Sequence, residues 1–328
     1  MRTALITGIQ GQDGSLLAEF LLSHDYHVVG SIRPGSDRNR GWLVPTTPRV
    51  TLVECSLQDA PGIQQIIDEH RPQEIYNLAA RASSLHLFAD PVLTGDCNGL
   101  AITRILEAIR AVDRSIRLCQ ASSSELYGNA AQSPQNERTP FQPRNPYGIA
   151  KRYAHEMVTL YRKTSGLFAC SAILFNHESP RRAAEFVTRK ICIGAARIAL
   201  GLQEYLELES LEATRDWGYA GDYVRAMWLM LQAEEPDDYV IATGEGHTVR
   251  DFCEVAFARV GLDYRKHIKV GARTHRQVES VRLVGDSTKI RSTLRWEPSV
   301  SFVELVHTMV DADVLVLQNN GAGLNKNT

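Results

Sequence analysis

Apolar residues gather in short runs that alternate with longer segments in which they recur at helical spacing. Six runs predict β-strands: Thr3–Thr7, His27–Ile32, Glu74–Leu78, Arg117–Ala121, Ala169–Phe175 and Tyr239–Ala242. Strands that alternate with helices are typical of parallel βαβ units. The first run is apolar on both faces, as expected where helices cover both sides of a sheet. The pattern therefore predicts an α/β fold, a doubly wound parallel-sheet Rossmann domain.

The alternation changes after Phe175, where a basic helix-like stretch over 181–200 precedes an acidic run over 204–212. The earlier pattern returns at about 217–231. This interruption predicts a smaller, discontinuous C-terminal substrate-binding lobe. We expect the Rossmann domain over 1–175 plus about 214–243, the lobe over 176–213 plus about 244–316, and a disordered tail over 317–328 that is rich in Asn and Gly.

Composition and charge argue against some classes of binding partner. A net charge of −2 and a pI near 6.6 argue against nucleic acid and against an anionic membrane surface. The six cysteines form no CxxC pair and no metal-ligand spacing, so we expect reduced thiols and a cytoplasmic protein. The opening MRTALITG is too short an apolar stretch for a signal peptide or a membrane span.

A glycine-rich loop follows the first strand, with the sequence Gly8-Ile-Gln-Gly11-Gln-Asp-Gly14, and a helical pattern begins at Ser15. Glycines let the backbone turn tightly and approach a pyrophosphate, whose charge then meets the N–H groups of the helix. Strand, glycines and helix in this order predict dinucleotide binding.

The second strand favours NADP over NAD. It lacks the acidic residue that would bind a ribose 2′-hydroxyl and instead leads to Arg33, with Ser36 and Arg38 nearby. A cation at this position suits a 2′-phosphate. The alternative is that both arginines are solvated loop residues.

The residues Tyr147 and Lys151 begin a helix behind Pro146, and their spacing of four places both side chains on one face. Upstream, the fourth apolar run opens into Ser123 and Glu125, at a strand end where doubly wound sheets bind ligands. A neighbouring ammonium and an oxidised nicotinamide would lower the pKa of a tyrosine toward that of a useful base. Glu125 is a second proton-transfer group, and the oxidation of an alcohol alone does not require one.

With these residues the chain resembles the extended short-chain dehydrogenase/reductase superfamily, and within it the GDP-mannose 4,6-dehydratase family, over about residues 3–314. The matching motifs are Gly8-Ile-Gln-Gly11-Gln-Asp-Gly14-Ser, Gln120-Ala-Ser-Ser-Ser-Glu-Leu-Tyr127-Gly, Pro146-Tyr-Gly-Ile-Ala-Lys151, Leu174-Phe-Asn-His-Glu-Ser-Pro-Arg-Arg182, Phe186-Val-Thr-Arg-Lys190, Arg215-Asp-Trp-Gly218 and Ala220-Gly-Asp-Tyr-Val224-Arg-Ala-Met-Trp228. The resemblance implies a nucleotide-sugar 4,6-dehydratase, a lyase that forms a 4-keto-6-deoxy sugar through an internal NADP redox cycle.

The resemblance also implies the site residues. Catalysis would use Ser123, Glu125, Tyr147 and Lys151, and no metal. The cofactor would contact Gly8, Gly11, Gln12, Asp13, Gly14, Arg33, Ser36, Ser56, Leu57, Leu78, Ala80, Tyr147 and Lys151. The GDP-sugar would contact Leu87, Asn176, Thr188, Arg189, Lys190, Arg215, Arg276 and Glu279, unless the basic stretch over 181–197 is simply a solvated helix. A homodimer or homotetramer is implied as well.

Several positions depart from the family pattern, and they cluster around the ligands. The family's Gln-Ser pair is replaced by Arg81-Ala82 and a hexose-facing serine by Leu87. Further departures are Pro34, Ser56, Glu209-Ser210 and Gln277. Loss of a hydrogen-bonding partner for a sugar hydroxyl changes substrate selectivity strongly. The identity of the hexose and of the nucleotide therefore stays open in the sequence.

Two alternatives remain at this stage. A nucleotide-sugar 4-epimerase shares the fold, Tyr147 and Lys151, but needs no base for C5 and in this superfamily usually carries a small or neutral residue at the position of Glu125. A binding or regulatory protein would have kept the fold and lost turnover. The complete set of four catalytic residues argues against that reading.

Overall fold

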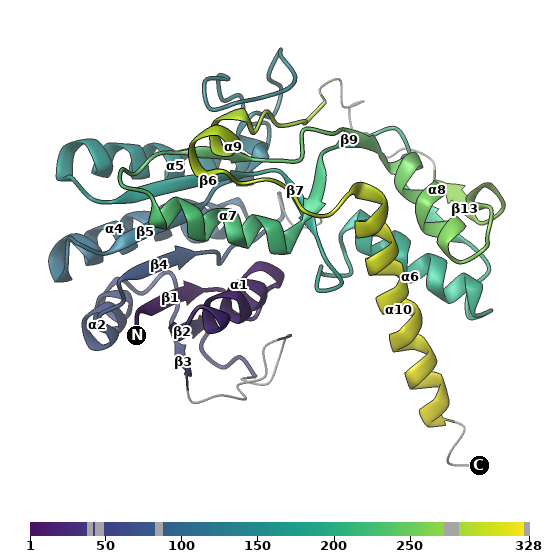
Figure 1. The fold of residues 1–328 in the computed structure, drawn as a ribbon, viewed down its shortest axis with the longest axis horizontal. Coiled ribbons are helices and arrows are strands. Elements are labelled where there is room, and N and C mark those ends of the chain that lie inside the picture. Colours follow the sequence, from purple (N-terminus) through teal and green to yellow (C-terminus); the bar gives the residue numbers. More distant parts are fainter. Residues whose placement is uncertain (38–41, 43–48, 83–87, 272–281, 325–328) are drawn as a thin grey trace.

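The computed structural model describes residues 1–37, 42, 49–82, 88–271 and 282–324. Its centre is a seven-stranded sheet in the order β11-β6-β5-β4-β1-β2-β3, with every neighbouring pair parallel (Figure 1). The strands are β1 (Thr3–Thr7), β2 (His27–Ile32), β3 (Val50–Glu54), β4 (Glu74–Asn77), β5 (Arg117–Ala121), β6 (Ala169–Leu174) and β11 (Tyr239–Ile241). The doubly wound parallel sheet predicted from the sequence is confirmed.

Helices cover both faces of the sheet. Successive residues of a strand point to opposite faces, so the apolar strands supply side chains to a core on each side. Ala4 and Ile6 of β1 face one core, while Leu5 faces the other. The first core is closed by α1 (Gln12–Ser23), α7 (Ala220–Gln232) and α9 (Thr288–Leu294). The second is closed by α2 (Ala60–His70), α4 (Ala101–Val112) and α5 (Pro146–Ser165), with α3 (Pro91–Gly95) and the π-helical turn η2 (Asp96–Leu100) packed against α5.

A separate core lies away from the sheet (Figure 1). It is formed by α6 (Val187–Ala199), α8 (Val249–Arg259) and α10 (Phe302–Leu324), with the parallel pair β8 (Leu206–Leu208) and β13 (Ile268–Val270) and the turn η4 (Tyr264–Lys266). Trp217, Phe252 and Phe302 pack together at its centre. Two stretches of chain far apart in sequence thus build one smaller lobe.

Two short strand pairs lie where the chain passes between the cores. The strand β7 (Asn176–Glu178) runs parallel to β10 (Trp217–Tyr219), and β9 (Thr214–Arg215) runs antiparallel to β12 (His247–Thr248). In the part of the chain that the structure describes, no helix is both long and apolar enough to cross a membrane.

The structure differs from the sequence reading at three places. Strand β3 was not among the six predicted; its residues are mostly half-buried at the sheet edge, so its apolar signal is weak. The helix α9 and Trp296 pack in the first core although they fall in the range predicted for the lobe. The tail predicted to be disordered is helical through Leu324, because extending an existing helix costs far less than starting one.

Candidate active site

The candidate residues gather at the carboxyl edge of the parallel sheet, where open α/β folds bind their ligands. The glycine loop follows β1, Arg33 follows β2, and Ser123 and Glu125 follow β5 in and beside the short 3-10 turn η3 (Ser124–Leu126). The Ser123 hydroxyl accepts a hydrogen bond from the backbone N–H of Glu125 at 3.2 Å. The turn thereby holds both side chains beside the start of α5.

The start of α5 is fixed by Asn145, a residue that the sequence reading did not single out. Its side-chain oxygen caps the helix by accepting from the Gly148 N–H at 2.8 Å, and its Nδ2 donates to Oε2 of Glu125 at 2.8 Å. A Cβ on Gly148 would lie 2.7 Å from the Glu125 carbonyl oxygen, so the close approach requires glycine. An Asn before Pro at a helix start was the available signal.

Lys151 is buried at 2% exposure, and its ammonium donates a hydrogen bond to the Ala121 carbonyl at 2.6 Å. The nitrogen lies 5.7 Å from the centroid of the Tyr147 ring. Burial lowers the pKa of Lys151 to about 8, while the charge of Asp13 acts in the opposite direction. The lysine therefore stands beside the tyrosine on one helix face, as the spacing of four predicted.

The pKa of Tyr147 is raised to about 12, chiefly by burial. The Ser123 hydroxyl lowers this pKa, whereas the charge of Glu125 raises it. The sequence predicts that the Lys151 ammonium and an oxidised nicotinamide together lower the pKa of Tyr147. The protein groups alone do not produce that result, so a phenolate at this position needs the further positive charge.

The glycine loop has the shape that a pyrophosphate needs. Gly8 adopts φ +72°, and a Cβ there would lie 2.8 Å from the backbone of Ala79, while a Cβ on Gly14 would overlap the Gly8 carbonyl oxygen. The N-cap position of α1 is Gly11, which has no side chain to cap the helix. The first N–H groups of α1 are thus open to an anion, and the loop fits a dinucleotide.

The side chains of Gln12 and Asp13 point to β7, the first strand after the sheet strand β6. His177 Nε2 lies 2.9 Å from Oδ2 of Asp13, and Gln12 Nε2 donates to the His177 carbonyl at 3.1 Å. The Ser179 hydroxyl donates to Gln12 Oε1 at 2.8 Å. These side chains thus join α1 to β7, and the contact of Gln12 and Asp13 with the cofactor stays a prediction.

The contacts of the His177 ring favour its protonated form. Its Nδ1 lies 2.7 Å from the Phe175 carbonyl, which can only accept, and its Nε2 faces a carboxylate. Burial would lower the pKa of His177, but Asp13 raises it overall. Burial alone would raise the pKa of Asp13, but the charge and hydrogen bond of His177 lower it to about 2. The two side chains form an ion pair in which His177 is buried and Asp13 is half-buried.

The other predicted cofactor residues surround the same edge. Arg33 and Ala80 are exposed and Ser36 and Leu78 are half-buried, while the backbone N–H of Leu78 donates to the Thr7 hydroxyl at 3.1 Å. Ser56 and Leu57 follow β3, and the Leu57 carbonyl accepts from Arg104 at 3.1 Å. These positions leave Arg33 open to a ligand.

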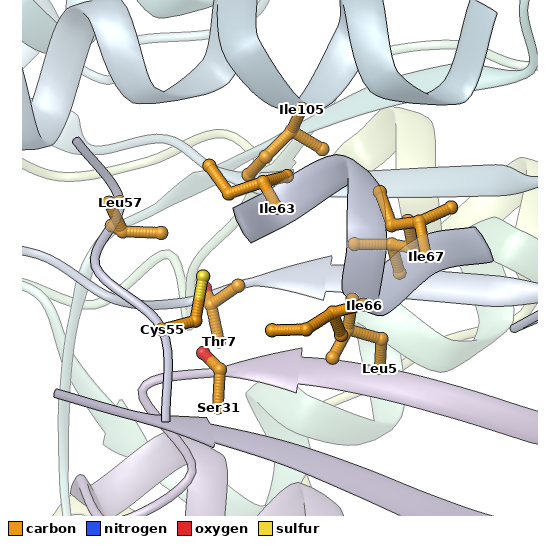
Figure 2. Close-up of a pocket in the computed structure, with 10 residues that line it drawn as sticks. Leu5, Thr7, Ser31, Cys55, Leu57, Ile63, Ile66, Ile67 and Ile105 are labelled. Carbon is orange, nitrogen blue, oxygen red and sulfur yellow. The ribbon is translucent and has the colours of Figure 1, made fainter. Parts of the chain in front are cut away.

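A cavity of about 20 Å³ lies beneath this edge, between the sheet and α2 (Figure 2). Its wall includes Cys55, Leu57, Ile63 and Ile105, with the hydroxyls of Thr7 and Ser31 as its polar groups (Figure 2). That volume is close to the minimum that holds one water molecule.

The predicted substrate residues divide into three groups. Asn176, Lys190 and Arg215 are at least partly accessible. Thr188 and Arg189 are buried: the Thr188 hydroxyl donates to Glu178 at 2.7 Å, and the Arg189 guanidinium pairs with Asp313 of α10. The described contacts of Thr188 and Arg189 thus lie inside the protein, and their contact with the GDP-sugar stays a prediction. Leu87, Arg276 and Glu279 lie outside the described residues, as does Gln277.

The described ranges contain no group of three or more His, Cys, Asp or Glu side chains placed to hold a metal ion. His177 is paired with Asp13, and Glu178 accepts from Thr188 and faces Arg182 at 3.2 Å. Both side chains therefore take part in hydrogen bonds and ion pairs within the protein.

Comparison with known proteins identifies relatives along nearly the whole chain. A family model described as GDP-mannose 4,6 dehydratase matches residues 5–309. The chain is 46% identical to GDP-mannose 4,6 dehydratase 2 of Arabidopsis thaliana over 95% of its own length and 87% of the relative. It is 44% identical to GDP-mannose 4,6 dehydratase of Homo sapiens, with 97% and 92% covered. The structure is similar to Thermus thermophilus UDP-glucose 4-epimerase in complex with NAD, with a TM-score of 0.82, 26% identity, and 95% and 98% covered.

The His177–Asp13 pair predicts a pH-dependent contribution to stability. Because the pKa of His177 is raised on folding, its contribution to the free energy of unfolding is complete below about pH 6.5, the pKa in the unfolded chain. This contribution is lost as pH rises through the higher pKa of the folded protein. The lowered pKa of Asp13 means that its contribution is complete above about pH 4 and is lost as pH falls toward 2. We expect His177→Gln to lower the free energy of unfolding by about 3 kcal/mol near pH 5.5, and by less near pH 9.

Urea denaturation of both proteins at the two pH values measures this difference. His70→Gln, in the last turn of α2, serves as the control and should show no comparable pH dependence. An equal loss of stability for His177→Gln at both pH values would show that the pair is not charged.

Proposed function

The chain belongs to the GDP-mannose 4,6-dehydratase family of hydro-lyases in the extended short-chain dehydrogenase/reductase superfamily, and we propose that it removes water from GDP-mannose with NADP as cofactor. Its activity is nucleotide-sugar 4,6-dehydration. The observation that supports the proposed mechanism is the placement of Glu125. Its carboxylate is held by Asn145 at the same helix start that carries Tyr147.

Bound NADP⁺ would accept hydride from C4 of the sugar and return hydride to C6, so that it is regenerated in each turnover. The Tyr147 oxygen takes the proton of the C4 hydroxyl, which leaves a ketone at C4. The Lys151 ammonium stabilises the phenolate that this proton transfer requires, against the burial that raises the pKa of Tyr147. Ser123 donates a hydrogen bond to the same sugar oxygen.

The C4 ketone acidifies the proton on C5, and the Glu125 carboxylate removes that proton. The C6 hydroxyl then leaves as water, with a proton from Glu125 or Ser123. The resulting C5–C6 double bond accepts hydride at C6 and a proton at C5. The sum of these steps is the loss of one water molecule and a 4-keto-6-deoxy sugar.

The GDP-sugar would meet Asn176, Lys190 and Arg215 at the side of the smaller lobe, where cations suit a diphosphate. The buried Arg189–Asp313 pair holds α6 against α10 and so shapes this wall. At the hexose side, Arg81 is held through its backbone, which exchanges two hydrogen bonds with the Asn98 side chain. We propose that GDP-mannose, or a closely related GDP-hexose, fits this altered wall.

Incubation with GDP-, UDP- and dTDP-hexoses, followed by mass spectrometry, tests the substrate. We expect water loss from GDP-mannose and none from the UDP- and dTDP-sugars. A product isomeric with the substrate would favour the 4-epimerase, and no change with any sugar would favour a binding protein.

Glu125→Gln in the same assay tests the proposed base. Loss of a general acid-base group costs about 10²- to 10⁴-fold in rate, so water loss should fall by that factor while the first hydride transfer persists as reduced cofactor. Glu156→Gln, on an exposed face of α5, is the matched control. Undiminished dehydration by the Glu125 variant would exclude its assignment.

NADP preference would come from Arg33, which is exposed after β2. Hydrogen bonds to charged groups contribute about 1.5–3 kcal/mol, so Arg33→Ala should weaken NADP binding by roughly 10- to 100-fold and leave NAD binding nearly unchanged. Fluorescence titration with both dinucleotides measures this ratio. Arg110→Ala on α4, where Arg110 pairs with Glu107, is the control. An equal loss for both cofactors would contradict a 2′-phosphate contact.

We also propose that the protein is a homodimer or homotetramer built through the outer face of α5. Ile149, Tyr153 and Leu160 of that helix are 58%, 39% and 48% exposed, and Leu100 beside them is 47% exposed. Large apolar groups gathered on one face mark an association surface. Sedimentation velocity should show Leu160→Glu dissociating the oligomer, and an unchanged sedimentation coefficient would exclude this face.

The location we propose is the cytoplasm, because all six cysteines, which lie in the described ranges, are free thiols. Fractionation of cells that make the protein tests this location.

A further inference from the structure

A buried carboxylate follows Arg215 directly in the chain. Asp216 is 0% exposed, and four hydrogen bonds from neutral donors satisfy it. Its Oδ1 accepts from the Thr243 N–H at 2.9 Å and from the Thr243 hydroxyl at 2.7 Å. Its Oδ2 accepts from the N–H groups of Gly244 at 2.9 Å and of Gly285 at 3.2 Å. The carboxylate thereby joins the chain between β9 and β10 to the turn after β11 and to the chain at Gly285.

The backbone of Arg215 is held between two of these segments. On one side it pairs antiparallel with His247 of β12, and on the other it forms a parallel bridge with Leu283. The Asp216 N–H adds a bond of 3.1 Å to the Leu283 carbonyl. The position of the Arg215 Cα therefore depends on the same segments that Asp216 gathers.

The chain at 282–286 is fixed from its other side by Gln135, which is also 0% exposed. The Gln135 side chain donates to the Arg282 carbonyl at 2.9 Å and accepts from the Val284 N–H at 3.2 Å. Its backbone bonds Val284 and Asp286 at 2.8 and 2.7 Å. Because Gln135 fixes this segment to the Rossmann domain, Asp216 ties Arg215 to a rigid support.

We propose that Asp216 is a positioning residue for nucleotide-sugar binding, which fixes Arg215 where it meets the diphosphate. This inference rests on the proposed function through the role given to Arg215. The carboxylate cannot reach the ligand, because every oxygen is occupied by protein donors in a fully buried site. Its effect on the reaction is expected in the KM for the sugar nucleotide.

Asp216→Asn tests the inference. The amide has the shape of the carboxylate, but its NH₂ group cannot accept the hydrogen bonds that one of the two carboxylate oxygens accepts. A misplacement of about 1 Å costs about 100-fold in an enzyme, so we expect KM for GDP-mannose to rise by about 10- to 100-fold. The kcat should change by less than about threefold, and NADP binding should not change. Thr243→Val, which removes one hydroxyl donor, should raise KM by a smaller factor.

Asp222→Asn is the matched control. Asp222, in the first turn of α7, is a buried carboxylate that accepts from the Ser299 N–H at 2.8 Å and from the Ser299 hydroxyl at 2.7 Å, and it makes none of the hydrogen bonds that hold Thr243, Gly244 or Gly285. This variant should lose thermal stability without a change in KM. If Asp216→Asn fails to fold, Thr243→Val carries the test alone.

Arg215→Ala separates the role of Arg215 in substrate binding from the positioning role of Asp216. If it raises KM while Asp216→Asn and Thr243→Val do not, the positioning role is wrong and the proposed function stands. If it leaves KM unchanged, the role given to Arg215 is wrong and the inference fails with it. Non-additive effects in the Arg215→Ala, Asp216→Asn double variant would support the inference, and full additivity in KM would overturn it.

Discussion

The arrangement of the site depends on the partly buried ion pair between Asp13 and His177. Asp13 stands at the start of the helix whose N–H groups face the glycine loop, and His177 stands on the first strand beyond the sheet. A charge buried alone would be strongly destabilising, so each residue requires the other. The pair therefore fixes the cofactor loop relative to the chain that enters the smaller lobe. The contacts of Arg181 with Ser15 and Glu19 strengthen the same junction.

The same junction bears on the chemistry of Tyr147. The charges of Asp13 and Arg182 both reach the tyrosine, and they act on its pKa in opposite directions. With burial dominant, the tyrosine is protonated in the protein alone. The base would form only when the positive charges of Lys151 and of an oxidised nicotinamide lie together beside it. Tyr147 would then take the proton of the C4 hydroxyl only in the complex with the oxidised cofactor, where hydride can also leave C4.

The sequence was most informative where local pattern and chemistry coincide. Apolar runs predicted six of the seven sheet strands, and the spacing of Tyr147 and Lys151 predicted their shared helix face. Contacts between distant residues were not predictable in this way. The charge of Arg189 suggested a diphosphate ligand, whereas its partner Asp313 lies 124 positions away on α10. Likewise, nothing local shows that Asn145 joins a helix cap to Glu125, or that Gln12 reaches Ser179.

The central claim is that one sugar molecule is oxidised at C4, loses water and is reduced at C6 by the same hydride. GDP-mannose carrying deuterium at C4 tests this claim most directly, in a mixture with unlabelled substrate and with the product examined by NMR and mass spectrometry. The account predicts a 4-keto-6-deoxy product in which each deuterium has moved from C4 to C6 of its own molecule. Deuterium that is retained at C4, exchanged between molecules or lost to solvent would contradict it.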